Sequence, residues 1–287
     1  MREITVISGK GGTGKTTLTA ALAAAGSDMV LCDGDVDAAD LHLILNPEIR
    51  ETHKFEGSWQ AQINTDLCTH CGICSEYCRF DAIVINGDNR IIDPFKCEGC
   101  RLCERICPSR AITSRRSLNN FWFVSDTRFG PMVHARMGPG EENSGKLVTR
   151  VRTRARELAS THHSGYILTD GPPGTGCPAI ASITGADAVL VVIEPSKSSL
   201  HDAKRVFELA EGFNIPVYAL INKHDIHPDT TREIEAFLKK KSIPLVGRIP
   251  FEKKFVEAMI EGKSIYEYDP GSEIATTLRG AWKSISA

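Results

Sequence analysis

The sequence predicts an α/β protein with a doubly wound, mostly parallel sheet and a small inserted α+β domain. Two observations carry this prediction. Short apolar runs rich in β-branched residues alternate with segments of helical periodicity over most of the 287 residues, and buried parallel strands with helices on both faces have this pattern. From about residue 55 to 115 the alternation stops and eight of the ten cysteines appear. We therefore expect a main domain of residues 1–54 and 116–287 around an insert of residues 55–115.

The expected strands and helices alternate in the order that a parallel sheet requires. EITVI predicts a first strand, residues 15–25 a helix with apolar residues at helical spacing, and MVLCDGD a second strand. After the insert, residues 123–146 are expected to form a hairpin and a glycine-rich loop that leads into a helix over residues 146–160. Later strands are predicted at YILTDGPP, AVLVVIEP, PVYALINK and PLVGRIPF, and later helices at residues 200–213, 230–241 and 274–286.

The composition is that of a soluble globular chain. With 41% hydrophobic residues the chain can bury a core, and a net charge of −2 gives no global attraction to nucleic acid or anionic lipid. The N-terminal MREITVIS is too short and too charged for a signal peptide, and no stretch reaches the roughly 18 apolar residues of a membrane span. We therefore expect a cytoplasmic protein, in which cysteines serve as metal ligands more often than as disulfides.

The loop after the first strand has the residues of a phosphate-binding loop. GKGGTGKT, residues 9–16, fits the pattern Gly-x-x-x-x-Gly-Lys-Thr between a strand and a helix, where backbone N–H groups and the helix N-terminus can cradle phosphate oxygens. Lys15 is expected to reach the β- and γ-phosphates, and the Thr16 hydroxyl to ligate Mg²⁺. The residues predicted to surround the nucleotide here are Gly11, Gly12, Thr13, Gly14, Lys15, Thr16 and Thr17.

A second lysine, Lys10, stands inside this loop. With lysine at this position the motif resembles the deviant phosphate-binding loop of the MinD/ParA/Mrp group of ATPases, which includes the nitrogenase iron protein. In that group the lysine reaches across a dimer to the phosphates bound by the partner subunit. The resemblance implies a catalytic role for Lys10, because an added positive charge assists phosphoryl transfer. It also implies a homodimer, or a heterodimer with a similar ATPase, that closes on ATP.

Two strand ends carry carboxylates that match the same group. VLCDGDVDAADL resembles its first switch segment, which implies that Asp33 lies near the magnesium shell and that Asp35 positions or deprotonates the attacking water. YILTDGPPGTG resembles its second switch segment and implies that Asp170 holds Mg²⁺ through water. Asp37 and Asp40 are expected to be loop and helix-cap residues.

The segment INKHD, residues 221–225, bears on the identity of the base. Asn-Lys-x-Asp is the guanine-recognition motif of GTPases, in which the aspartate accepts from the base. In the MinD-like ATPases an asparagine at the same place contacts adenine, which implies that role for Asn222. The deviant loop favours ATP, and Asp225 keeps GTP open.

Each half of the insert repeats one cysteine pattern. CTHCGICSEYC and CEGCRLCERIC both have the spacing Cys-x₂-Cys-x₂-Cys-x₃-Cys, which is that of bacterial-type ferredoxins with two 4Fe-4S clusters, whereas zinc sites more often present two separated pairs. In those ferredoxins the fourth cysteine of each half ligates the other cluster. The resemblance implies one cluster on Cys68, Cys71, Cys74 and Cys107, and another on Cys97, Cys100, Cys103 and Cys78. Arg79 departs from the motif, which expects proline after Cys78.

Several other residues have plain structural interpretations. Cys32 is expected to be a small buried residue of its strand, and Cys177 to cap or pack a helix beside Pro178, with an interfacial metal or redox role as the alternative. The arginines between Arg150 and Arg156 are expected to form a solvated surface more often than a DNA-binding stripe. The C-terminal helix has too few basic residues for a membrane anchor and is expected to pack on its own domain.

Nearly the whole chain resembles MinD-superfamily ATPases that carry an inserted ferredoxin domain. The function this implies is a dimeric ATPase that couples its nucleotide state to electron transfer through two 4Fe-4S clusters to a protein partner. An iron–sulfur cluster or metal carrier that passes its cargo to an acceptor protein is one alternative. A spatial organiser like MinD and ParA is the other. No stable association with nucleic acid or membranes is expected.

Overall fold

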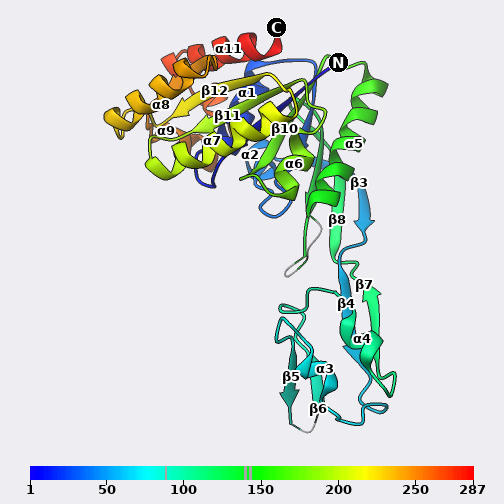
Figure 1. Cartoon of the computed structure of the whole chain (residues 1–287). Helices are drawn as coiled ribbons and strands as arrows, with labels where there is room; N and C mark the ends of the chain where they lie inside the picture. Colours follow the sequence, from blue (N-terminus) through cyan, green and yellow to red (C-terminus); the bar gives the residue numbers. More distant parts are fainter. Residues whose placement is uncertain (88, 139–140, 142–143) are drawn as a thin grey trace. The chain divides into compact units, whose positions relative to one another are not determined.

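The computed structural model describes residues 1–87, 89–138, 141 and 144–287, with only the backbone of Ser144, and the chain forms two compact units. Unit 1 comprises Met1–Thr52, Trp122–Arg136 and Ser144–Ala287, and unit 2 comprises His53–Phe121 and Met137–Asn143. Figure 1 labels the helices and strands of both units. Strands β3 (Glu48–Phe55) and β8 (Asn120–Thr127) each span the boundary between the units.

The described part of unit 1 is built on a nine-stranded sheet with the order β13-β12-β11-β1-β10-β2-β9-β8-β3. The pairs β1–β10, β1–β11, β10–β2, β11–β12, β12–β13 and β2–β9 are parallel. The predicted mostly parallel sheet is therefore confirmed. Besides β3 and β8, its strands are β1 (Arg2–Ser8), β2 (Met29–Asp33), β9 (Gly130–Arg136), β10 (Tyr166–Pro173), β11 (Ala188–Ile193), β12 (Val217–Asn222) and β13 (Leu245–Ile249).

Helices cover both faces of this sheet because the strand residues alternate between two apolar cores. Ile4 and Val6 of β1 belong to the core that includes residues of α1, α2, α10 and α11, and Ile7 belongs to the core that includes residues of α6, α7 and α8. The helices of unit 1 are α1 (Lys15–Ala25), α2 (Leu41–Leu45), α5 (Ser144–His162), α6 (Cys177–Ile183), α7 (Lys197–Gly212), α8 (Pro228–Lys240), α9 (Lys254–Ile260), α10 (Ile265–Tyr268) and α11 (Glu273–Ser286).

The segment before α5 forms the hairpin that the sequence predicts. Arg128 and Phe129 link β8 to β9, and these strands are neighbours in the sheet. Four residues of the predicted glycine-rich loop, 139–140 and 142–143, lie outside the described residues. The C-terminal helix α11 buries Leu278, Trp282 and Ile285 in the first core, as expected. Among the described residues no helix is both long and apolar enough to cross a membrane.

Unit 2 has two similar halves. Its elements are β4 (Trp59–Ile63), α3 (Ile73–Glu76), β5 (Ile83–Asn86), β6 (Asn89–Ile92), α4 (Leu102–Ile106) and β7 (Ile112–Arg116). Strands β4 and β7 pair antiparallel, as do β5 and β6. The small core is formed by Ala61, Cys74 and Ile112, and three other cysteines pack against it. So little apolar surface leaves the unit short of a core of its own, which is the situation in which a bound metal group commonly adds stability.

Unit 2 is larger than the insert expected from the sequence, residues 55–115. It begins at His53, continues to Phe121 and includes Met137–Asn143. Within it, Glu141 accepts hydrogen bonds from Ser117 Oγ, from Gln60 Nε2 at 3.3 Å and from Asn120 Nδ2 at 3.3 Å. The local pattern of the sequence gives no sign of these contacts because Gln60 and Glu141 are far apart in the chain.

Candidate functional site

The loop between β1 and α1 is shaped by its glycines. Gly12 and Gly14 have φ angles of 80° and 86°, which L side chains rarely adopt. Gly9 lies so close to α7 that an added Cβ would stand 2.5 Å from the backbone carbon of Asp202. The loop then runs directly into α1 at Lys15, so its N–H groups and the helix N-terminus are available to an anion.

The cradle formed by this loop is a cavity of about 460 Å³. The sequence-predicted residues Gly11, Gly12, Thr13, Gly14, Lys15, Thr16, Thr17 and Asp35 all line it. Pro172 and Pro173, from the end of β10, form another part of the wall. The ends of β1, β2 and β10 meet here because they are neighbours in a parallel sheet, and ligands of such sheets bind at the carboxyl ends of the strands.

Lys15 lies among carboxylates at the base of the cradle. Its Nζ donates to Asp170 Oδ1 at 2.9 Å and to Asp35 Oδ2 at 3.4 Å, and Thr16 Oγ1 donates to Asp170 Oδ2 at 2.7 Å. Burial acts to lower the pKa of Lys15, but the charges of Asp170 and Asp35 outweigh it and the pKa is raised. The lysine is therefore cationic. Thr19 was not anticipated from the sequence, and its Oγ1 donates to Asp170 Oδ1 at 3.1 Å.

Asp33 and Asp35 follow one another at the end of β2 but differ in environment. Asp33 is fully buried and accepts from the N–H groups of Asp35 at 3.1 Å and Leu41 at 3.2 Å. Burial, and then the charge of Asp170, raises the pKa of Asp33 well above its usual range. Burial also raises the pKa of Asp35, although Lys15 opposes this. Carboxylates and a threonine hydroxyl gathered in this way are the donor set that Mg²⁺ takes in phosphate sites.

Lys10 does not point freely into solvent. Its Nζ lies 2.5 Å from Glu194 Oε1 and within 3.2 Å and 3.4 Å of the hydroxyls of Ser196 and Ser198. Glu194 Oε2 also lies 3.3 Å from Lys223 Nζ. Glu194, Ser196 and Ser198 were not identified from the sequence, although the polar string EPSKSS directly after an apolar strand was a signal.

Asn222 and Lys223 hold the phosphate-binding loop from the far side. Asn222 Nδ2 donates to the carbonyl of Thr13 at 2.8 Å, and Lys223 Nζ donates to the carbonyl of Gly12 at 3.0 Å. Asp225 is exposed, and its Oδ1 accepts from the N–H of Phe251 at 2.7 Å. In this structure Asn222 therefore supports the loop, and its expected contact with adenine stays a prediction.

The eight cysteines of unit 2 line two cavities. One is lined by Cys68, Cys71, Cys74 and Cys107, and the other by Cys74, Cys78, Cys97, Cys100 and Cys103. Burial raises the pKa of Cys103 to about 11. The thiol of Cys107 accepts from the N–H of Ala111 at 3.3 Å. Over the described ranges, no group of three or more histidine, cysteine, aspartate or glutamate side chains is arranged to hold a metal ion.

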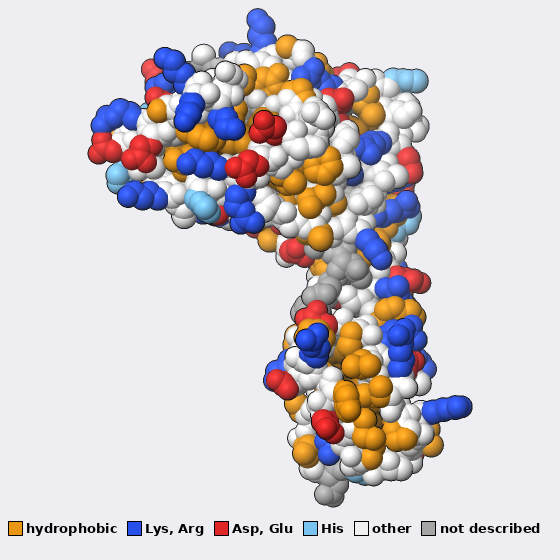
Figure 2. Space-filling model, in the orientation of Figure 1, with side chains coloured by type: hydrophobic (Ala, Val, Ile, Leu, Met, Phe, Trp, Pro, Cys, Tyr) orange, Lys and Arg blue, Asp and Glu red, His pale blue; other side chains and the backbone are white. Residues whose placement is uncertain are grey.

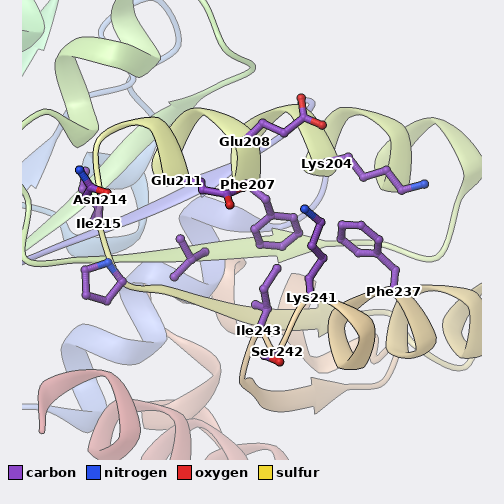
Figure 3. A pocket seen from close by; sticks show the side chains of 12 residues that line it. Lys204, Phe207, Glu208, Glu211, Asn214, Ile215, Phe237, Lys241, Ser242 and Ile243 are labelled. Carbon is purple, nitrogen blue, oxygen red and sulfur yellow. The ribbon is translucent and has the colours of Figure 1, made fainter.

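Another cavity, of about 510 Å³, lies away from both sets of residues. Figure 3 shows it between α7 and α8, with the rings of Phe207 and Phe237 facing it. The two ring centroids are 5.9 Å apart, and Lys204 Nζ lies 5.2 Å from that of Phe237. None of the sequence-predicted site residues lines this cavity.

A comparison with protein families decides the class of the cradle. A family model described as "CbiA: CobQ/CobB/MinD/ParA nucleotide binding domain" matches residues 4–265. The chain belongs to this family. Uncharacterized protein MJ0578 of Methanocaldococcus jannaschii is 34% identical over 226 residues, which cover 77% of this chain and 78% of that one. The septum site-determining protein MinD of Synechocystis is 24% identical over 273 residues, 92% of this chain and 81% of that one.

Solved structures of the same family share the fold. MinD in the MinC:MinD cell division protein complex of Aquifex aeolicus aligns with a TM-score of 0.59 and 20% identity, over 99% of this chain and 95% of that chain. MinD of Pyrococcus horikoshii, solved with Mg-ADP, aligns with a TM-score of 0.58 and 19% identity over the same shares. The MinD-like α/β fold with a mostly parallel sheet is thus shown for this chain.

Two expectations about other residues of this CbiA-family chain were wrong. The arginines of α5 do not all form a solvated surface, because Arg152 is 3% exposed and its Nη2 lies 2.5 Å from Glu3 Oε1. Cys177 does not cap α6, because the cap is Gly176 and Cys177 is the exposed first residue of the helix. Cys32 is fully buried, as expected, and burial raises the pKa of its thiol.

Proposed function

We propose that this protein binds and hydrolyses Mg-ATP and that two copies close around the nucleotide. The observation that carries the proposal is the meeting of Lys15 and Thr16 with Asp35 and Asp170 in the phosphate cradle. The family is a nucleotide-binding one, and a relative of the same fold was solved with Mg-ADP. ATP is favoured over GTP because the phosphate-binding loop with Lys10 resembles that of ATPases.

The residues of the cradle divide the work of phosphoryl transfer. In the free protein Lys15 and Thr16 both bond to Asp170. With Mg-ATP bound, Lys15 would contact the phosphates, and Thr16 and Asp170 would hold the magnesium ion. Bound Mg²⁺ neutralises the charge that develops on the phosphate oxygens. Asp35 lines the cradle beside Lys15, where it positions the attacking water and accepts its proton.

The first test separates nucleotide binding from closure. We expect Lys15→Met to abolish ATP binding, measured by titration with a fluorescent ATP analogue. We expect Lys10→Ala to bind ATP normally, yet to stay monomeric with Mg-ATP in analytical ultracentrifugation and to hydrolyse ATP at least tenfold more slowly. Lys239→Ala, which removes an exposed lysine of α8, is the matched control. If Lys10→Ala dimerised as readily as Lys239→Ala, the role of Lys10 in trans would be contradicted. Parallel titrations with GTP test whether the site prefers adenine or guanine.

The output that the comparisons support best is a switch of the MinD or ParA type that acts on a partner protein. MinD relatives are recurrent matches over 90% or more of this chain, and one MinD was solved in complex with MinC. Unit 2 offers a surface of the kind that partners cover. Figure 2 shows a run of hydrophobic side chains on its visible face, and the exposed large apolar residues of this unit include Tyr77, Phe80, Ile85, Phe95 and Leu102.

That output is tested by asking what the ATP-bound form binds. Binding to anionic lipid vesicles is measured by sedimentation, and binding to duplex DNA by gel shift. Each assay is run with Mg-ATP and with Mg-ADP. ATP-dependent binding to either one supports the organiser function. Equal binding in both nucleotide states excludes it.

Electron transfer through two 4Fe-4S clusters is a second candidate, and the cysteine cavities favour it. One cavity is lined by the four cysteines implied for the first cluster, and the other by the four implied for the second together with Cys74. A single ion needs every sulfur about 2.3 Å from one point. A 4Fe-4S cluster instead binds each thiolate to a different iron, so its ligands stand farther apart. The donor set of eight thiols therefore fits clusters, which would supply one-electron redox chemistry.

Iron and sulfide analysis after anaerobic purification tests this candidate. We expect about eight irons per chain, about half of that in Cys103→Ala, and no loss in Cys32→Ala, whose thiol lies in β2 of unit 1. A tenfold nucleotide effect on a redox equilibrium appears as a shift of about 60 mV, so titration with Mg-ATP and with Mg-ADP measures coupling. Transfer of iron to an acceptor apo-protein, in place of retention, would favour the carrier function.

A further inference from the structure

The contacts of Lys10 occupy its full bonding capacity within one chain. An ammonium has three N–H donors, and Lys10 Nζ has three acceptors, one carboxylate oxygen of Glu194 and the hydroxyls of Ser196 and Ser198. Only 30% of the lysine side chain and 20% of that of Glu194 are exposed, so the pair is partly shielded from water. A lysine held in this way cannot also contact phosphates bound by another subunit.

Glu194 is built to release Lys10 without being left unpaired. It directly follows Ile193, the last residue of the apolar strand β11, and its carboxylate is shared between two cations. Oε1 lies 2.5 Å from Lys10 Nζ, and Oε2 lies 3.3 Å from Lys223 Nζ. If Lys10 leaves, Lys223 still neutralises the carboxylate and keeps its bond to the carbonyl of Gly12 at 3.0 Å. Departure of Lys10 therefore leaves no isolated buried charge, which is the costly case.

We propose that Glu194 is a positioning residue that holds Lys10 in cis and thereby opposes closure of the ATP-bound dimer. This inference rests on the proposed function of Lys10 in trans. Each subunit must release one Lys10 before the dimer can form, so the restraint enters the dimerisation equilibrium twice. The carboxylate is ionised at neutral pH, because Lys10 and Lys223 outweigh the effect of burial and lower the pKa of Glu194.

The expected effect follows from the exposure of the pair. A partly exposed ion pair of this kind contributes up to about fivefold to an equilibrium, so two such pairs contribute up to about 25-fold. Glu194→Gln keeps the shape of the side chain and one accepting oxygen and removes its charge. We expect this variant to dimerise with Mg-ATP at a protein concentration up to about 25-fold lower than the wild type requires, with unchanged affinity of the monomer for ATP.

Two measurements test the inference independently. The first is the monomer–dimer equilibrium with Mg-ATP, by analytical ultracentrifugation, of the wild type, Glu194→Gln and Lys10→Ala. The second is the rate at which an amine-acylating reagent modifies Lys10 in the nucleotide-free protein, followed by peptide mass spectrometry. Glu208→Gln, which removes an exposed carboxylate of α7 outside the cradle, is the matched control for both.

The outcomes separate this inference from the proposed function. Faster acylation of Lys10 and tighter dimerisation of Glu194→Gln support the restraint. Unchanged acylation or unchanged dimerisation of Glu194→Gln, in a wild type that does dimerise, overturns it. Faster acylation without an ATP-dependent dimer of any variant shows that the contact in cis exists and that the proposed dimer, and with it the restraint on closure, is wrong.

Discussion

His134 of β9 should make unit 1 less stable in acid. Its imidazole is 6% exposed and stacks on Phe123, with ring centroids 5.0 Å apart, and on His42, with centroids 6.3 Å apart. Its Nε2 lies 2.9 Å from Ser125 Oγ. Burial, and then the neighbouring His42, lowers the pKa of His134 from 6.5 to about 4. Protonation would place an imidazolium against another histidine in a site that water barely reaches.

The sign and size of the effect follow from this pKa. In the unfolded chain the imidazole titrates near its ordinary pKa, about 6.5. Because the folded pKa is depressed, the unfolded state binds more protons between these two values. The contribution of His134 to stability is therefore fully present above pH 6.5 and is lost as the pH falls toward 4. With about 1.4 kcal/mol for each unit of pKa difference, the loss amounts to about 3 kcal/mol at pH 4.

Urea unfolding followed by tryptophan fluorescence measures this loss in the nucleotide-free protein. We expect His134→Gln to be less stable than the wild type at pH 7, because it loses the ring stacking, and this deficit should shrink by about 3 kcal/mol at pH 4. His201→Gln, which removes an exposed histidine of α7, is the control. A difference between wild type and His134→Gln that stays constant from pH 7 to pH 4 would refute the argument.

Two further predictions concern the backbone of the cradle and the buried ion pair of unit 1. Gly14→Ala places an L side chain at a φ of 86° and brings its Cβ into overlap with the amide of Asn222, so ATP affinity should fall at least tenfold. Gly12→Ala, at a φ of 80° with no atom within 4 Å of the new Cβ, should suffer only the backbone strain and lose less affinity. Equal losses of affinity in a fluorescent-nucleotide titration would contradict this distinction. Glu3→Gln leaves the guanidinium of Arg152 buried without a carboxylate, so the free energy of unfolding should fall by about 3–5 kcal/mol, and a loss below about 1 kcal/mol in chemical denaturation would count against it.

The phosphate cradle could be predicted because its information is local. A motif of eight residues fixes the turn, and the aspartates at the ends of β2 and β10 come together because neighbouring parallel strands end at the same edge of the sheet. Asp35 and Asp170 are therefore predictable partners of Lys15. The sequence does not predict that Lys15 and Thr16 both donate hydrogen bonds to Asp170 in the nucleotide-free protein.

The contacts that sequence analysis missed join residues far apart in the chain. Lys10 and Glu194, which form an ion pair, are 184 positions apart in the sequence. Glu3 and Arg152 form another ion pair and are 149 positions apart. From periodicity alone a charged residue is expected to be exposed. A buried ion pair forms where another element brings an opposite charge against that residue, and only the order of the strands shows which elements face each other. The helix α5 has arginines all round, so its pattern gave no sign that Arg152 packs against the start of β1.

The strand order also indicates which residues outside the cradle should change their dynamics when nucleotide binds. Asp33 ends β2, and β2 pairs with β9, the strand that carries His134. The N–H of Leu41, the first residue of α2, bonds to Asp33, and the next residue of α2, His42, stacks on His134. Contiguity alone does not demonstrate coupling, so an element with two arrangements must be found. We expect ATP to change hydrogen exchange in β8 and β9 of the wild type and to change it less in His134→Gln, with ATP affinity preserved. Equal changes in hydrogen exchange in both proteins would mean that the contact between α2 and β9 does not transmit the nucleotide state to these strands.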